Sequence, residues 1–101
     1  MTTKLINVRE IIEQKRAEDP VFRIEFDRVH LEYQLIMQLV KERKAMDMSQ
    51  DELAKKSGIS QQALSRLERE KHVPTLSTFI KIINALGLEI TLTKRKETDS
   101  I

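Results

Sequence analysis

A segment in the middle of the chain carries side chains suited to reading nucleic acid. Placed on a helix at about 100° per residue, residues 61–69 separate into two arcs. Amide, hydroxyl and guanidinium groups fill one arc: Gln61, Gln62, Ser65, Arg66 and Arg69. Each group can hydrogen-bond a base edge or a phosphate, and none is an acid. The segment therefore predicts a DNA-reading helix, and a plain solvated face is the alternative.

These side chains divide by expected role. Gln61, Gln62 and Arg66 are the predicted base contacts, because a Gln amide pairs with adenine and a guanidinium with guanine in the major groove. Phosphate contacts position a protein on DNA without reading its sequence. The predicted phosphate contacts on or near this segment are Lys44, Ser65, Arg69 and Lys71.

Two short predicted helices joined at Gly58 must position this face. Ser49 and Glu52 have the spacing of a capping box, which predicts a helix that begins there and ends at Ser57. Gly58 supplies a turn with positive φ, and Ser60 caps a second helix that we expect to run through Glu70. Two helices joined in this way form a helix-turn-helix pattern.

Further helices are predicted on both sides of this pair. Asp19 and Pro20 mark the start of a long helix that ends near Ala45. Its apolar seam, at helical spacing, is Phe22, Phe26, Val29, Tyr33, Ile36 and Val40. A shorter amphipathic segment precedes it, with Leu5, Val8, Ile11 and Ile12. A last helix opens at Pro74 and Thr75, ends at Gly87, and has the predicted core face Leu76, Phe79, Ile80, Ile83 and Leu86.

The hydropathy period changes from 3.6 to 2 after Gly87. Leu88, Ile90 and Leu92 alternate with polar residues, which predicts one short strand over 88–94. An unpaired strand leaves its backbone groups without partners, so we expect it to pair with the same strand of a second copy. The resulting homodimer would set two DNA-reading helices about 34–36 Å apart. A dimer through the last helix is the alternative.

Composition limits the class of protein. The 101 residues are 40% hydrophobic and 34% charged, with two Gly, two Pro and no Cys. These counts predict a mainly α fold of about five helices and argue against an all-β fold. Without Cys, a signal segment or a long apolar run, the chain is expected to be cytoplasmic and not to bind a membrane. We assign residues 1–38 to a helical extension, 39–87 to the DNA-binding domain, 88–94 to the strand and 95–101 to a polar tail.

Enzyme chemistry has little support in the sequence. His30 and His72 lie far apart and lack carboxylates at ligand spacing, so no metal site is expected. There is no Gly-rich phosphate loop, because Gly58 and Gly87 are the two glycines of the chain. We therefore expect no catalytic activity and no cofactor.

Several motifs together resemble the Cro/C1-type (XRE) helix-turn-helix family of phage and bacterial repressors over residues 39–87. They are Ser-Gln-Asp-Glu-Leu-Ala at 49–54, Ser-Gly-Ile-Ser at 57–60, Leu-Ser-Arg-Leu-Glu at 64–68, and Pro-Thr-Leu at 74–76 with Ala-Leu-Gly at 85–87. The resemblance implies that Gln50 meets a phosphate and that Arg43 pairs with Glu68. Asp47 and Glu70 stand where the family often has Gly, so strained or altered turns are expected there.

The flanks are most similar to HigA-type antitoxins of bacterial type II toxin–antitoxin pairs. The similar segments are 19–22, 32–33, 39–43 and 88–93. The resemblance implies a dimer that binds its own operator, a double-stranded DNA, and neutralises a RelE/HigB-like ribonuclease. We assign toxin binding to residues 1–38, with the apolar contacts Leu5, Val8, Ile12, Phe22 and Phe26.

Three alternatives remain at this stage. The two amino-terminal segments can fold on each other as a hairpin, whose outer face is still free to bind a toxin. The chain can be a stand-alone repressor with no toxin partner. It can also be a helical adaptor that binds proteins and no DNA.

Overall fold

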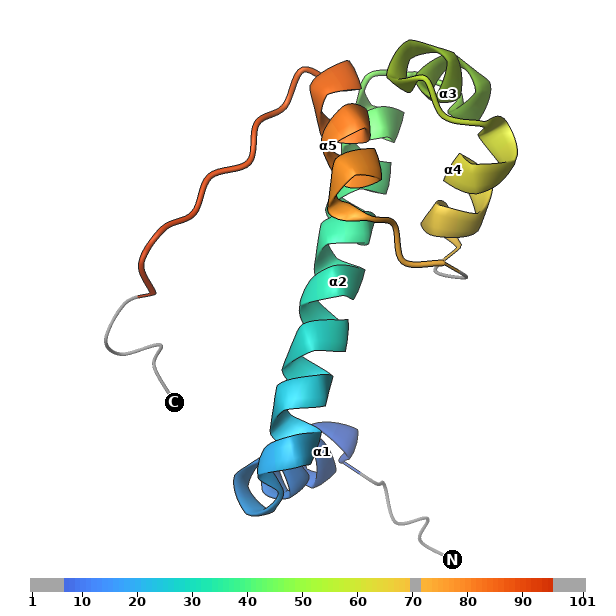
Figure 1. Ribbon diagram of the computed structural model, residues 1–101. Coiled ribbons are helices and arrows are strands. Elements are labelled where there is room, and N and C mark those ends of the chain that lie inside the picture. Colours follow the sequence, from blue (N-terminus) through green and yellow to red (C-terminus); the bar gives the residue numbers. More distant parts are fainter. Residues whose placement is uncertain (1–6, 70–71, 96–101) are drawn as a thin grey trace, which may run out of the picture. The chain divides into compact units, whose positions relative to one another are not determined.

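Five helices follow one another in the part of the chain that the computed structural model describes, residues 7–69 and 72–95 (Figure 1). They are α1 (Val8–Glu18), α2 (Pro20–Ala45), α3 (Gln50–Ser57), α4 (Gln61–Glu68) and α5 (Leu76–Ala85). They belong to two compact units, Met1–Ile36 and Met37–Ile101, and α2 contributes to both. The predicted mainly α fold is confirmed. Among the predicted positions, Leu5, Glu70, Lys71 and residues 96–101 lie outside the described residues.

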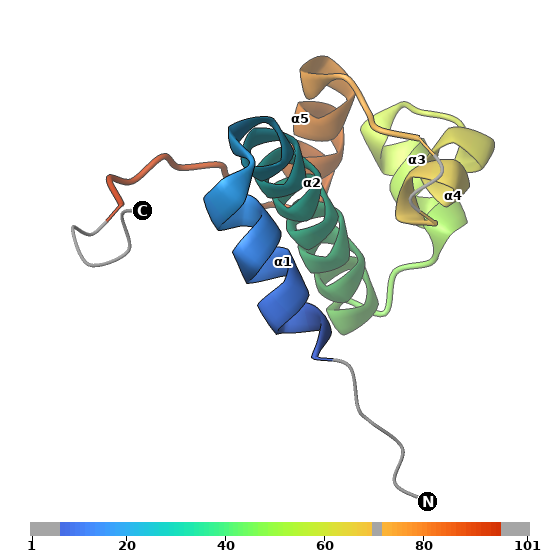
Figure 2. The ribbon, with the colours of Figure 1, turned by 90° about the horizontal axis from the view of Figure 1, so that it is seen from below.

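Unit 1 is a helical hairpin made of α1 and the first part of α2 (Figure 2). Asp19 separates the two helices, and its carboxylate accepts hydrogen bonds from the backbone N–H groups of Val21 and Phe22, both at 3.1 Å. Arg16 of α1 donates two hydrogen bonds of 2.9 Å to the Asp27 carboxylate of α2. The hairpin that the sequence left as an alternative is therefore present in the structure.

Unit 2 holds a small apolar core formed by four helices. Its fully buried side chains are Leu39 of α2, Leu53 of α3, Leu64 and Leu67 of α4, and Ile82 of α5. The central element is α3, which packs against both α4 and α5. This core fixes the direction in which α4 presents its remaining face.

The predicted turn between α3 and α4 is found. Ser49 accepts from the Glu52 backbone N–H at 3.0 Å, and the Glu52 carboxylate accepts from the Ser49 backbone N–H at 3.0 Å. Gly58 then ends α3 with φ +79°, a conformation that costs a residue with a Cβ considerably more. Ser60 begins α4 by accepting from the Ala63 N–H at 3.0 Å. Local sequence signals thus define the geometry of the two-helix motif.

Two of the predicted apolar faces are wrong in detail. In α5 the buried residues are Ile82, Ile83 and Ala85, followed by Leu86, whereas the predicted core residues Leu76 and Ile80 are exposed. In α2 the seam misses Leu39, which is almost completely buried, and includes Val29 and Tyr33, which are about half exposed. α2 carries more than one apolar row, and the apolar arc of α5 is wider than the part that packs, so spacing alone does not select the buried residues.

The predicted strand at 88–94 is also wrong for this chain by itself. Residues 88–95 form neither helix nor strand, and Leu92 is 95% exposed. Gly87 has φ +73°, and the Leu88 N–H donates to the Ile83 carbonyl at 3.0 Å, which closes the end of α5. A strand needs a hydrogen-bonded neighbour, and no strand occurs in residues 7–69 or 72–95 to provide one. Among these same residues, no helix is long and apolar enough to cross a membrane.

Candidate nucleic-acid interface

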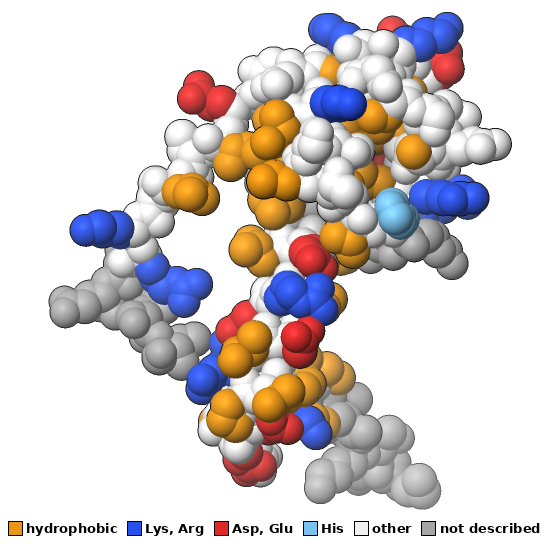
Figure 3. Space-filling view, in the orientation of Figure 1, with side chains coloured by type: hydrophobic (Ala, Val, Ile, Leu, Met, Phe, Trp, Pro, Cys, Tyr) orange, Lys and Arg blue, Asp and Glu red, His pale blue; other side chains and the backbone are white. Residues whose placement is uncertain are grey.

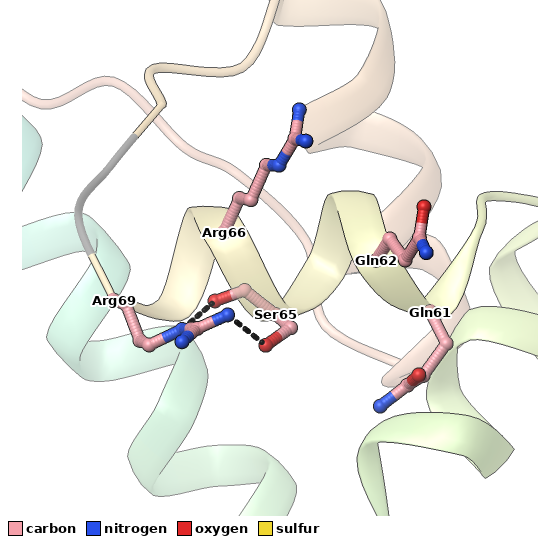
Figure 4. Close-up of a pocket in the computed structure, with 5 residues that line it drawn as sticks. All are labelled: Gln61, Gln62, Ser65, Arg66 and Arg69. Carbon is pink, nitrogen blue, oxygen red and sulfur yellow. Dashed lines mark hydrogen bonds between the residues drawn. The ribbon is translucent and has the colours of Figure 1, made fainter.

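The five polar side chains predicted on α4 lie together in the structure. Leu64 and Leu67 are buried on one side of α4, so the other side faces solvent. There one pocket of about 370 Å³ is lined by the predicted set, Gln61, Gln62, Ser65, Arg66 and Arg69 (Figure 4). The lining has hydrogen-bond donors at every position, two guanidinium groups and no carboxylate.

Arg69 is held at the carboxyl-terminal end of this face. Its Nη2 donates to the Ser65 hydroxyl at 3.0 Å, and its Nε lies 3.4 Å from the Ser65 carbonyl oxygen (Figure 4). The helix ends at Glu68 with Arg69 as its C-cap, earlier than the predicted end at Glu70. The two glutamines stand at the other end of the helix, so the face carries amides at its start and a cation at its end.

A buried ion pair connects α4 to α2. Arg43 is 8% exposed, and its Nε and Nη2 donate to the two oxygens of Glu68 at 2.7 and 2.8 Å. Its remaining nitrogen, Nη1, donates to the Met48 carbonyl at 2.7 Å. Such two-point pairing fixes direction as well as distance. The arrangement therefore sets the position of the last turn of α4 relative to the end of α2.

Gln50 joins the same network from α3. Its amide nitrogen donates to Glu68 Oε1 at 2.9 Å, and its amide oxygen accepts from Gln61 at 3.5 Å. An amide nitrogen carries two hydrogens, so one remains for a phosphate. Sequence reasoning placed Gln50 at the DNA but missed its link to Gln61. Their separation of eleven residues gave no periodic signal for that contact.

Lys44, a predicted phosphate contact, and the turn after α2 are the remaining described parts of the candidate interface. Lys44 is exposed in the last turn of α2. Asp47 follows with φ +52°, the left-handed conformation that favours Gly, which agrees with the altered turn expected at this position. The predicted phosphate contact Lys71 lies outside the described residues.

The residues predicted to bind a toxin are separated by the structure. Val8 is exposed, whereas Ile12, Phe22 and Phe26 are half-buried within the hairpin of unit 1. The Phe22 and Phe26 rings stack at 5.6 Å, and Lys15 of α1 lies 5.5 Å from the Phe22 ring centre. Hairpin packing therefore explains the aromatic residues of this set. Sequence reasoning did not single out the exposed apolar side chains of α2 outside the predicted seam, which are Val21, Ile24, Leu31 and Leu35.

Two short helices joined at a left-handed Gly, with a polar and cationic outer face on the second helix, define a helix-turn-helix DNA-binding domain. Comparison with protein families agrees, because the family described as helix-turn-helix matches residues 39–92. The match covers more than half of the chain. This protein therefore belongs to the helix-turn-helix family, and the predicted XRE-type resemblance is confirmed.

Three relatives show what kinds of protein are similar. Antitoxin HipB of Escherichia coli K12 is 37% identical over 71 residues, which cover 70% of this chain and 81% of the relative. Antitoxin HipB of a second Escherichia coli strain is 35% identical over 71 residues, covering 70% of this chain and 76% of the relative. The uncharacterized HTH-type transcriptional regulator y4dL of Sinorhizobium fredii is 39% identical over 62 residues, 61% of this chain, and the match spans 32% of that regulator. No solved structure matches the chain. Both antitoxins carry the name HipB, so the HigA type stays a prediction.

Proposed function

We propose that this chain is the antitoxin of a type II toxin–antitoxin pair. It binds its own operator as a dimer, represses its own transcription, and neutralises a cognate toxin by direct binding. The observation that carries the proposal is the acid-free pocket of α4, in a chain 37% identical to an antitoxin over most of that relative's length.

On the operator, α4 enters the major groove with its pocket toward the bases. Gln61 and Gln62 pair with adenine edges and Arg66 with guanine. The described phosphate contacts are Gln50, Lys44, Ser65 and Arg69. Support comes from their common placement on or beside one solvent-facing helix, where the Arg43–Glu68 pair holds the helix in position.

The dimer forms through the segment that follows α5. Leu88 is half-buried, and Ile90 and Leu92 are exposed with alternating polar neighbours. The backbone N–H and C=O groups of this extended segment gain partners when a second copy lies beside it. The alternative contact is α5 itself, which exposes Leu76 and Ile80.

The toxin binds the amino-terminal region, residues 1–38. In keeping with the HigA-type resemblance, we expect an RNA-cleaving protein of the RelE/HigB-like class. A protein that binds RNA carries a basic surface. The described residues of unit 1, 7–36, hold seven Asp or Glu against five Lys or Arg, which suits such a surface.

A stand-alone repressor is the second candidate, because y4dL is named as a transcriptional regulator. Both candidates predict binding to the DNA upstream of the gene, with an affinity that falls steeply as salt increases. They differ in what they predict for the protein encoded by the neighbouring open reading frame. The antitoxin proposal expects that its product arrests growth and that this chain restores growth. A neighbouring product without toxicity would favour the stand-alone repressor.

A further inference from the structure

Unit 1 exposes an unusual share of its large apolar side chains. Among residues 7–36, Ile36 alone is buried. The exposed large hydrophobics of this region are Val8, Ile11, Val21, Ile24, Val29, Leu31, Tyr33 and Leu35. Figure 3 shows hydrophobic side chains interleaved with acidic and basic ones along this part of the molecule. A hairpin of this size gains little stability from its own core, so a partner surface is expected.

Four of these side chains lie along one side of α2, two on each side of Arg28, and we call this row the outer stripe. Its members, with their exposed fractions, are Val21 (71%), Ile24 (62%), Leu31 (56%) and Leu35 (41%). Their spacings of three, seven and four residues put them on one side of a helix, as in a coiled-coil seam. Phe22, whose ring lies near Lys15 of α1, is on the opposite side of α2, about 160–180° from Ile24 and Leu31. Asp27, which pairs with Arg16 of α1, lies about 40° from Leu31 and therefore at one edge of the stripe. α1 therefore reaches one edge of the outer stripe through this ion pair, while the four apolar side chains themselves stay exposed.

A charged cluster sits in the middle of the outer stripe. Arg28 occupies the seam position between Ile24 and Leu31, and it donates to Glu25 at 2.7 and 3.1 Å and to Glu32 at 3.1 and 3.2 Å. The hydrogen bond to Glu25, the charge of that group and the similar contacts with Glu32 raise the pKa of Arg28. Two carboxylates thus share one cation. The cluster keeps one excess negative charge at the centre of an apolar surface.

The charge of unit 1 and the exposed apolar area of the outer stripe indicate what kind of partner binds there. Nucleic acid is disfavoured, because residues 7–36 carry more acids than bases, whereas residues 37–69 carry seven bases against five acids. A second copy would place two acidic surfaces in contact, which costs binding energy. The four apolar side chains expose roughly 400 Å², about half of what each partner buries in a stable interface. The partner must therefore also cover the charged cluster, which calls for a cationic protein surface.

We propose that the outer stripe is the docking surface for the toxin, a proposal that rests on the antitoxin function proposed above. Apolar side chains of the toxin pack against Ile24 and Leu31. A Lys or Arg of the toxin lies near Glu25 and Glu32 and balances their excess charge. The half-buried aromatic residues of unit 1 then support the shape of the hairpin and do not form the contact.

The test measures binding of the purified product of the neighbouring open reading frame to full-length variants. Ile24→Asp and Leu31→Asp change exposed residues, so the helix should still form. Each should weaken binding at least about 30-fold, as expected for a residue at the centre of an interface. Val29→Asp is the matched control, because it makes the same kind of change at an apolar residue that is 52% exposed and lies about 160° around α2 from Leu31 and about 140° from Ile24. It should change binding less than about 3-fold. All three variants should bind operator DNA as the unchanged chain does.

A separate variant tests the charged cluster. Glu32→Gln should slow association with the neighbouring product and weaken its dependence on salt, because it removes the excess negative charge that attracts a cationic partner. An unchanged association rate would contradict the cationic partner.

The remaining outcomes separate the two proposals. If the unchanged chain fails to bind the neighbouring product, the antitoxin function itself fails. If it binds and both stripe variants bind equally well, the outer stripe is not the docking surface, although the function stands. If the stripe variants instead reduce the mass of the free chain in solution and keep their binding, the stripe is an interface between copies and the inference is overturned.

Discussion

At the scale of single residues, the Glu68 carboxylate determines how firmly α4 is held. It accepts two hydrogen bonds from Arg43 and one from Gln50, and its side chain is 5% exposed. Replacing it by Ala leaves the Arg43 cation buried without its partner. We expect Glu68→Ala to lower the free energy of unfolding by about 3–5 kcal/mol, measured by urea denaturation at neutral pH.

An exposed ion pair on α3 provides the control for Glu68→Ala. Lys55 lies 3.2 Å from Asp51, and both side chains are largely exposed. Lys55→Ala should lower the free energy of unfolding by less than about 1 kcal/mol. A loss for Glu68→Ala no greater than this would show that the buried pair does not anchor α4.

Gln62 and Lys44 should differ in what they contribute to DNA binding. Gln62→Ala removes a base contact, so it should reduce preference at one base pair by about 1–3 kcal/mol and leave binding to random DNA unchanged. Lys44→Ala removes a phosphate contact, so it should weaken binding to all sequences and flatten the salt dependence. Titrations of operator and random DNA at several salt concentrations measure both. Equal losses on both DNAs for Gln62→Ala would remove it from the base-reading set.

At the scale of elements, the capping box makes the start of α3 sensitive to acid. The hydrogen bond from the Ser49 backbone lowers the pKa of Glu52 from its ordinary value of 4.5. A carboxyl group whose pKa is lower in the folded state stabilises the fold above its ordinary pKa, and this contribution is lost as the pH falls through the folded value. Glu52→Gln should therefore lower the melting temperature at neutral pH.

The difference between Glu52→Gln and the unchanged chain should shrink as the pH falls below 4.5. Thermal melts at a series of pH values measure this trend. Glu89→Gln, outside the helices, is the control for loss of charge alone. A difference that stays constant down to the lowest pH would contradict the role of the carboxylate.

Local signals predicted the elements better than they predicted which faces pack. The start of α2 at Pro20 and the turn at Gly58 follow from residues a few positions apart, and the structure has both. The burial of Ile82 does not follow from such signals, because the apolar arc of α5 is wider than the part that packs, and Ile82 and Ile80 lie at its opposite edges. Leu39 was missed for a similar reason, since α2 carries a second apolar row that includes Leu31 and Leu35.

Local signals likewise predicted one part of the candidate site and missed another. The face of α4 could be predicted because helical periodicity alone gathers its five side chains. The position of Gln50 between Glu68 and Gln61 depends on how α3 packs against α4, which no local pattern encodes. The segment after Gly87 has the alternation of a strand, but the hydrogen-bonding neighbour that would make it one is absent from residues 7–69 and 72–95.

At the scale of the whole molecule, the dimer should depend on the segment that follows α5. A chain ending at Gly87 keeps the helices of unit 2 but loses Leu88, Ile90 and Leu92. We expect this chain to sediment as a monomer and to bind the operator much more weakly, because it no longer engages two half-sites together. A truncated chain that still sediments as a dimer would move the interface to α5.

The central claim is that one chain carries a DNA-binding surface and a toxin-binding surface that can be separated. It is tested most directly by recording growth and own-promoter activity in the same cells, which also express the neighbouring open reading frame. Arg66→Ala should raise promoter activity and still restore growth. A chain that begins at Tyr33 should repress the promoter and fail to restore growth. Full growth with the shortened chain would contradict the account, because toxin binding would then belong to the helix-turn-helix unit.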